Sequence, residues 1–272
     1  MKPAAFDYAQ PDTLGEALAL MAKKGEAARI CAGGQSLAAM MNMRLATPEV
    51  LIDIAGLAEL QTIDIANGAI EVGAGVTQAE LLAWPKLAEF QPLLAQLLPW
   101  VGHYQTRARG TVCGSLAHSD PSSELPLALA LLGGDVFVRS QRGHRIINAE
   151  DFQVGMMATA LEADEMIVAA RFPLARPATA SAFEEVAQRH GDFAIVAVGA
   201  VGNKDGVRLG VGGVADTPGV VDLTWPVADA ALNDFAWSLG GADDQHATAR
   251  YRRELVRRIG RRVIDEVHNA LP

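Results

Sequence analysis

The chain contains few cysteines, which excludes several classes of redox and metal protein. Among its 272 residues only Cys31 and Cys113 are cysteines. Two thiols cannot supply the four ligands of a structural zinc site or of a conventional iron–sulfur cluster held by this chain alone, and they argue against a disulfide framework. Redox chemistry is therefore expected to come from an organic cofactor or from a partner.

Long apolar runs and excess positive charge are also missing. No run reaches the roughly 18 apolar residues that a membrane span needs. The opening MKPAAFDYAQPDTLGEAL holds no apolar stretch of signal-peptide length, so we expect a cytoplasmic protein. The formal net charge is −9 at pH 7, which gives no positive field for nucleic acid. An anionic ligand would have to be held locally, by backbone N–H groups, helix ends or a few arginines.

Two familiar phosphate-binding motifs are absent as well. The chain has no GxxxxGK[ST], and neither AGGQSL nor VGAGVTQAEL has the three-glycine spacing of a dinucleotide fingerprint. Nucleotide binding of those two kinds is not expected.

A short glycine-rich stretch is nevertheless present near the N-terminus. Residues 30–40 read ICAGGQSLAAM, an apolar strand that runs into Gly33 and Gly34 and then into small polar residues. Glycine allows positive φ and close approach of the backbone, and successive free N–H groups can form a concave nest for an anion. A tight turn is the alternative interpretation.

The densest polar region lies further along, in RGTVCGSLAHSDPSSEL. Its triad-like residues His118, Ser119 and Asp120 are adjacent, so they cannot face one another as a nucleophile–base–orienter set. We interpret the stretch as a ligand-wrapping loop, in which hydroxyls and N–H groups bind phosphates and Glu124 binds sugar hydroxyls. The alternative is a polar loop that opens a helix. Cys113 has no activating cysteine or lysine close in sequence, which favours a packed structural role.

Hydrophobic periodicity and turn residues predict the helices, strands and domain boundary of the chain. Asn67-Gly68 predicts a hairpin between TIDI and AIEVGA. A composition change over 173–182 predicts a domain boundary. The predicted helices are 12–24, 37–46, 123–132, 227–239 and 246–271, with one over 77–102 in two pieces broken by Pro85 and Pro92; the predicted strands are 29–34, 49–54, 135–138, 144–147 and 165–173, followed by a meander over 181–190, 192–203 and 207–216.

The two glycine-rich stretches together resemble a known family. AGGQSLAAMMNMRLATPEVLIDI, followed by QTRARGTVCGSLAHSDPSSELPLAL, is similar to the FAD-binding medium subunit of molybdenum hydroxylases, the family of the carbon monoxide dehydrogenase medium subunit and the xanthine dehydrogenase flavin domain. The resemblance extends over almost the whole chain, including GDFAIVAVGA and YRRELVRR.

The resemblance implies an FAD site and no catalytic or metal-binding residue in this chain. The loop from Ala32 to Ala38 would wrap the pyrophosphate with backbone N–H groups, and the second stretch would complete the phosphate and flavin contacts. The implied cofactor-binding residues are Ala32, Gly33, Gly34, Gln35, Ser36, Leu37, Ala38, Gly102, Thr111, Gly114, Ser115, His118, Ser119, Asp120, Glu124 and Ile167.

The same resemblance implies an α+β fold with two domains. A two-part FAD-binding domain of the vanillyl-alcohol-oxidase type would occupy 1–176, with subdomains of about 1–55 and 56–176, and an α+β domain with an antiparallel sheet and helices would occupy 177–272. The implied partners are a large molybdopterin-binding subunit and a small [2Fe–2S] subunit, assembled as a dimer of heterotrimers. Electrons would pass from those clusters through FAD to an external acceptor.

Two departures from the family pattern bear on this interpretation. Cys113 stands where the family commonly has glycine, and Glu184 and Glu185 stand in a segment that often carries a lysine. Two other functions remain open from the residues: a stand-alone FAD-dependent oxidoreductase with its own substrate pocket, and a flavin-free assembly subunit.

Overall fold

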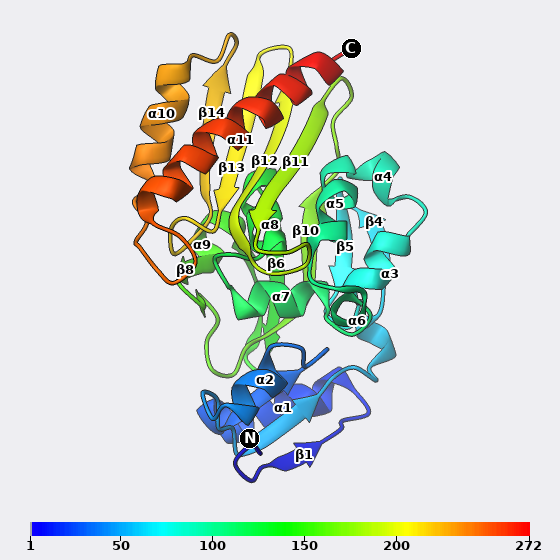
Figure 1. Ribbon diagram of the computed structural model, residues 1–272. Helices are drawn as coiled ribbons and strands as arrows, with labels where there is room; N and C mark the ends of the chain where they lie inside the picture. Colours follow the sequence, from blue (N-terminus) through cyan, green and yellow to red (C-terminus); the bar gives the residue numbers. More distant parts are fainter. Residues whose placement is uncertain (1) are drawn as a thin grey trace.

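The structure, a computed structural model, describes residues 2–272 and begins with a small α/β lobe (Figure 1). Thr13 caps the first helix by accepting a hydrogen bond from the N–H of Glu16, and Gly25, with φ +52°, ends it. The lobe has a parallel three-stranded sheet in the order β1-β3-β2. Its elements are β1 (Asp7–Ala9), α1 (Leu14–Lys24), η1 (Gly25–Ala27), β2 (Ala28–Cys31), α2 (Leu37–Asn42) and β3 (Val50–Asp53).

A five-stranded sheet follows, and the predicted hairpin forms its edge. Asn67 and Gly68 both have positive φ, 52° and 76°, as a type I′ turn requires. The strand order is β4-β5-β10-β6-β7. The strands are β4 (Ile63–Ala66), β5 (Ala69–Gly73), β6 (Asp135–Ser140), β7 (Gly143–Asn148) and β10 (Met166–Pro173); η2 (Ala58–Leu60) precedes them, and α9 (Ala149–Phe152), β8 (Gln153–Gly155) and β9 (Ala158–Thr159) lie between β7 and β10.

The helical region between β5 and β6 is more divided than the sequence suggested. The expected two-piece helix is instead three short helices and a 3₁₀ turn. Pro92 stands at the first position of a helix, where its missing N–H removes no bond, so it begins a helix rather than breaking one. The segments are α3 (Gln78–Ala83), α4 (Leu87–Phe90), α5 (Pro92–Leu97), η3 (Leu98–Trp100), α6 (Tyr104–Arg107), α7 (Val112–His118) and α8 (Glu124–Leu132).

Helix α7 corrects the interpretation of residues 112–118 as a ligand-wrapping loop. Thr111 accepts a hydrogen bond from the N–H of Gly114 at 3.0 Å, which caps the helix. Val112, Cys113 and Leu116 supply its buried face. The small residues Gly114, Ser115 and Ala117 lie on the more exposed side of this helix, and their composition hid its period.

The C-terminal half is an antiparallel sheet with helices on both faces. Figure 1 shows α11 lying across the sheet, with α10 beside it and α8 on the opposite side. The sequence predicted three strands; the fourth, β14, was missed. The elements are β11 (Ala180–Ala187), β12 (Ala194–Asn203), β13 (Gly206–Gly212), β14 (Gly219–Thr224), α10 (Asp229–Ser238) and α11 (Ala249–Ala270).

Apolar side chains form two main cores. One draws on elements from α1 to β10, and the other lies between the C-terminal sheet and α10 and α11. A small third cluster of Leu127, Ala194 and Ala197 joins α8 to β12. Within residues 2–272, no helix has the length and apolarity that a membrane crossing requires.

Candidate cofactor-binding site

The two glycine-rich stretches lie in direct contact. A Cβ atom at Gly33 would lie 2.0 Å from the carbonyl oxygen of Arg109 and 2.8 Å from the Cα of Gly110. Both contacts are with backbone atoms, which cannot move aside as the end of a side chain could. Only glycine therefore lets the loop after β2 reach the segment before α7.

The first loop presents a row of unused backbone donors. Gly34 has a left-handed φ of +66°, which turns the chain toward α2. Among residues 2–272, the structure gives no hydrogen-bond acceptor for the N–H groups of residues 33–37; the first bond after them runs from Ala38 N–H to the Gly34 carbonyl at 3.0 Å. Consecutive free N–H groups around a left-handed residue have the chemistry of an anion-binding nest.

A third glycine-rich stretch holds the second loop in place. The N–H of Gln78 donates to the Gly110 carbonyl at 2.8 Å, and the N–H of Val112 donates to the Val76 carbonyl at 3.1 Å. Thr77 and Thr111 form an antiparallel bridge. VGAGVTQAEL lacks a dinucleotide fingerprint, and sequence reasoning missed this supporting role because the contacts run through the backbone.

Helix α7 directs its polar residues away from the sheet and its thiol into the core. Gly114 is exposed and Ser115 is half-buried near the start of the helix. Cys113 is buried, and its Sγ donates to the Val72 carbonyl at 3.5 Å. Burial raises the pKa of this thiol to about 12. The predicted structural role of Cys113 fits this environment, because a thiolate is scarce at such a pKa.

The far end of α7 holds the next group of predicted residues. His118 is half-buried in its last turn, and Ser119 adopts a left-handed φ of 53° just beyond it. Gln153 Nε2 donates to Ser119 Oγ at 2.9 Å, and Asp120 accepts from the N–H of Ser122 at 2.8 Å. With a rise of 1.5 Å per residue, α7 separates this group from Thr111 by roughly 10 Å.

Gly102, Glu124 and Ile167 lie outside the contact between the two loops. Gly102 has a φ of +54°, and its carbonyl oxygen would lie 2.9 Å from a Cβ atom at Gly191. Glu124 is buried at the start of α8, and Ile167 is buried in β10. The structure thus brings the loop of residues 32–38 to Arg109 and Gly110 through Gly33, while the other predicted residues extend along α7 and beyond.

Arg109 is a site residue that sequence reasoning missed. Its side chain is exposed. Desolvation raises the pKa of the Cys31 thiol, and the negative charge of Asp53 raises it further. The positive charge of Arg109 lowers the same pKa. The guanidinium is thus close to the end of β2, where the nest begins. A cation directly before Gly-Thr in an acidic chain is the sequence feature that could have identified it.

Comparison with known proteins identifies the family. Residues 4–175 match the family described as the FAD binding domain in molybdopterin dehydrogenase. The chain is 37% identical to the nicotine 6-hydroxylase medium subunit of Paenarthrobacter nicotinovorans, over 98% of each chain. It is 31% identical to the carbon monoxide dehydrogenase medium chain of Afipia carboxidovorans, over 97% of each chain. The carbon monoxide dehydrogenase structure from Hydrogenophaga pseudoflava superposes with a TM-score of 0.93 at 28% identity, over 100% of each chain.

The chain therefore belongs to the FAD-binding domain family of the molybdopterin dehydrogenases. It is an oxidoreductase subunit of the medium-subunit type found in molybdenum hydroxylases, and the α+β fold class expected from the resemblance is confirmed.

The residues of the nest fit the pyrophosphate of FAD. Neutral N–H donors from residues 33–37 can bind phosphate oxygens without a charged side chain in the loop itself. Arg109 adds positive charge beside them, and guanidinium groups bind phosphate oxygens well. A Cβ atom at Gly33 would break the contact that brings Arg109 to the loop.

Proposed function

We propose that this chain binds FAD and carries electrons from [2Fe–2S] clusters of a partner subunit to an external acceptor. The observation that supports the proposal best is the row of five unbonded N–H groups, residues 33–37, joined to Arg109 through Gly33. An acidic chain with a net charge of −9 needs such a local arrangement to hold a dianionic pyrophosphate.

The chain's own residues would bind and orient the cofactor, while FAD supplies the electron-accepting chemistry when bound. Backbone donors of Ala32 to Ala38 would hold the pyrophosphate, and Arg109 would offset its charge. Thr111, Gly114 and Ser115 would continue the contacts at the start of α7. The remaining proposed contacts are Gly102, His118, Ser119, Asp120, Glu124 and Ile167.

The proposed partners follow from the names of the relatives. Two of them are a medium subunit and a medium chain, which implies larger and smaller subunits in those complexes. We propose that this chain likewise pairs with a large molybdopterin-binding subunit and a small [2Fe–2S] subunit, as a dimer of heterotrimers. The domain limits of 1–176 and 177–272 are part of the same proposal.

The decisive experiment is a visible spectrum of the purified chain, followed by chromatography of the cofactor released on denaturation. FAD at close to one per chain supports the proposal. Absence of flavin after incubation with excess FAD, in both the isolated chain and the coexpressed complex, contradicts it and favours the flavin-free assembly subunit. Copurification of molybdenum and iron with the coexpressed complex distinguishes an electron-transfer subunit from a stand-alone flavin enzyme.

A further inference from the structure

Helix α11 packs on the C-terminal sheet with one side and leaves its other side open (Figure 1). The side on the sheet is formed by Val256, Ile259, Val263 and Val267. The open side carries Arg250, Arg257, Arg261 and His268, at intervals of seven, four and seven residues. Such spacing places side chains along one line of a helix. We call these four residues the outer stripe.

The charged residues of α11 have the composition of a protein interface. The helix holds seven arginines, three acidic residues and no lysine, in a chain whose net charge is −9. A guanidinium is more weakly hydrated than an ammonium group, and arginine is enriched at protein interfaces where lysine is depleted. Solubility alone could be provided by lysine, so the exclusive use of arginine favours contact with a partner.

The first half of α11 carries a surplus of positive charge. Glu254 is the one carboxylate for two guanidiniums, lying 3.1 Å from Arg257 and 2.7 Å from Arg258. Arg250 is exposed and forms no ion pair within residues 2–272. A partner that covers this half of the helix therefore needs carboxylates to match these charges.

Two exposed aromatic side chains lie at the same end of α11. Trp237 at the end of α10 is 60% exposed, and Tyr251 is 47% exposed. The guanidinium carbon of Arg253 lies 4.0 Å from the centroid of the Trp237 ring and holds that ring in place. Tryptophan, tyrosine and arginine are the residues that most often dominate the binding energy of protein interfaces.

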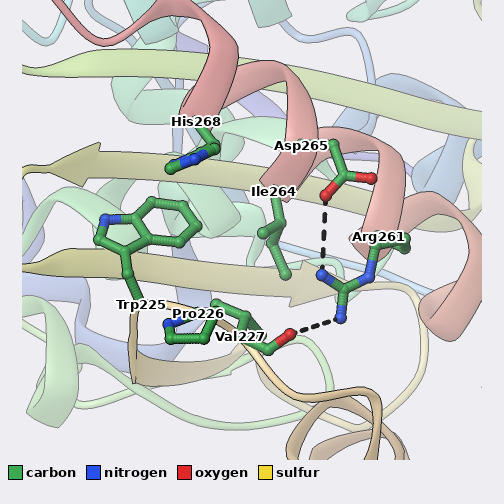
Figure 2. Close-up of a pocket in the computed structure, with 7 residues that line it drawn as sticks. All are labelled: Trp225, Pro226, Val227, Arg261, Ile264, Asp265 and His268. Atoms are coloured by element: carbon green, nitrogen blue, oxygen red, sulfur yellow. Dashed lines mark hydrogen bonds and ion pairs between the residues drawn. The ribbon is translucent and has the colours of Figure 1, made fainter.

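The other end of the outer stripe borders an open cavity of about 380 Å³ (Figure 2). Trp225 forms one wall, and its indole N–H donates to the Asn203 carbonyl at 2.8 Å. The ring of His268 lies 4.7 Å from that of Trp225. On the opposite side, Arg261 Nη2 donates to the Val227 carbonyl at 2.9 Å. The cavity thus has positioned aromatic and apolar walls that suit an apolar side chain of a partner.

The open surface has the size of a stable interface. A helix of 22 residues is about 33 Å long, and two helices side by side are roughly 20–24 Å wide. A strip of α11 and α10 with these dimensions is close to the area of about 800 Å² that a specific interface buries on each partner.

The position of the outer stripe indicates which partner covers it. Helix α8 lies on the other face of the sheet, where a Cβ atom at Gly199 would lie 2.9 Å from Leu131 Cδ2, and α7 contacts α8. A subunit that delivers electrons to the flavin has to lie near α7 and the nest. The small [2Fe–2S] subunit is therefore expected on that side, which leaves the outer stripe to the large subunit.

We propose, on the basis of the function proposed above, that the outer stripe, Trp237 and Tyr251 dock on an acidic surface of the large molybdopterin-binding subunit. Carboxylates of that subunit pair with the guanidiniums of Arg250 and Arg257. An apolar side chain of the same subunit enters the cavity beside Trp225.

The first test is the stability of the complex made by coexpressing the full chain with the large and small subunits. Mass photometry on dilution gives the concentration at which half of the complexes have lost this chain. Arg257→Glu and Trp237→Ala should each raise that concentration at least about tenfold. Arg176→Glu reverses an exposed charge between β10 and β11 and should leave it unchanged. The FAD content per chain should be the same in all four proteins, so a failure of docking is distinguished from a failure to bind FAD.

A second measurement needs no variant. Phenylglyoxal should label Arg250 and Arg257 in the isolated chain and much more slowly in the complex, whereas Arg176 should be labelled equally in both. Equal labelling of Arg257 in chain and complex, or wild-type stability of both variant complexes, would overturn the docking proposal even where FAD binding is established. Protection of the two arginines already in the isolated chain would assign the surface to a second copy of the chain instead. A wild-type chain that retains FAD but binds no large subunit would also overturn the proposal.

Discussion

The backbone of Gly33 lies directly against the carbonyl group of Arg109, so two segments far apart in sequence share one surface. This relationship places five unbonded N–H groups next to the backbone of Arg109, whose charge acts on Cys31 at the end of β2. Binding of an anion at this place therefore depends on a glycine, on a cation and on the geometry of the loop, and each can be changed separately.

Replacing the glycine should remove FAD binding. In Gly33→Ala the new Cβ would lie 2.0 Å from the Arg109 carbonyl oxygen, so one of the two loops must move. We expect FAD affinity to fall at least about tenfold, corresponding to roughly 1.4 kcal/mol, in a fluorescence titration. Gly15→Ala is the control, because its Cβ has only Thr13 Oγ1 nearby, at 3.8 Å. Equal affinity in Gly33→Ala and wild type would refute the assignment of this loop.

Removing the guanidinium should weaken FAD binding while leaving the fold intact. Because hydrogen bonds to charged groups contribute about 1.5–3 kcal/mol, Arg109→Gln should lower FAD affinity roughly tenfold or more and reduce its dependence on salt. Arg250→Gln removes the same charge from the exposed first turn of α11 and serves as the control. If both variants bind FAD with the wild-type affinity and salt dependence, Arg109 is not a phosphate contact, even where FAD binding itself is established.

The thiol at the end of β2 should report on occupancy of the nest. Cys31 is half-buried, and its Sγ would lie 3.2 Å from a Cβ atom at Gly34. We expect iodoacetamide to label Cys31 slowly, because burial raises the pKa of its thiol, and faster as pH rises. Saturating FAD should slow the labelling, as measured by mass spectrometry of the peptides. Cys113, with a pKa of about 12, should stay unlabelled in the folded chain. A Cys31 rate that is unaffected by bound FAD would place the cofactor elsewhere.

The cap of α7 should contribute to stability. Thr111→Val keeps the shape of the side chain and removes the hydroxyl that accepts from Gly114 N–H, which should cost about 1 kcal/mol in the free energy of unfolding. Thr111→Ser keeps the hydroxyl and should lose less. Urea unfolding of the two variants and wild type measures the difference, and equal midpoints for Thr111→Val and wild type would contradict the capping role.

Much of the fold could be predicted from local patterns. Asn67-Gly68 defines a hairpin because both residues tolerate positive φ, and Thr13 followed by apolar residues at helical spacing defines α1. Strand β14 was missed because GVVDLT lies among glycine- and proline-containing loops, and its pairing with β13 is a tertiary contact that local patterns do not show.

The candidate site was harder to predict from local sequence patterns. The two loops were identified by resemblance, but their contact depends on tertiary packing of Gly33 against Arg109. Glu185 follows Glu184 in a strand, and glutamate is usually exposed. Nothing local in the sequence shows that Glu184 forms an ion pair with Arg262 whereas Glu185 is buried.

The small apolar cluster that joins α8 to β12 has a consequence for how the chain can be divided. The C-terminal sheet completes one of its faces with leucines from α8, so neither half has a closed surface without the other. At the exposed Arg176, the connection between β10 and β11 can be cut without removing this packing. A protease that cuts there would leave a nicked molecule whose two fragments remain bound to each other and whose fold persists.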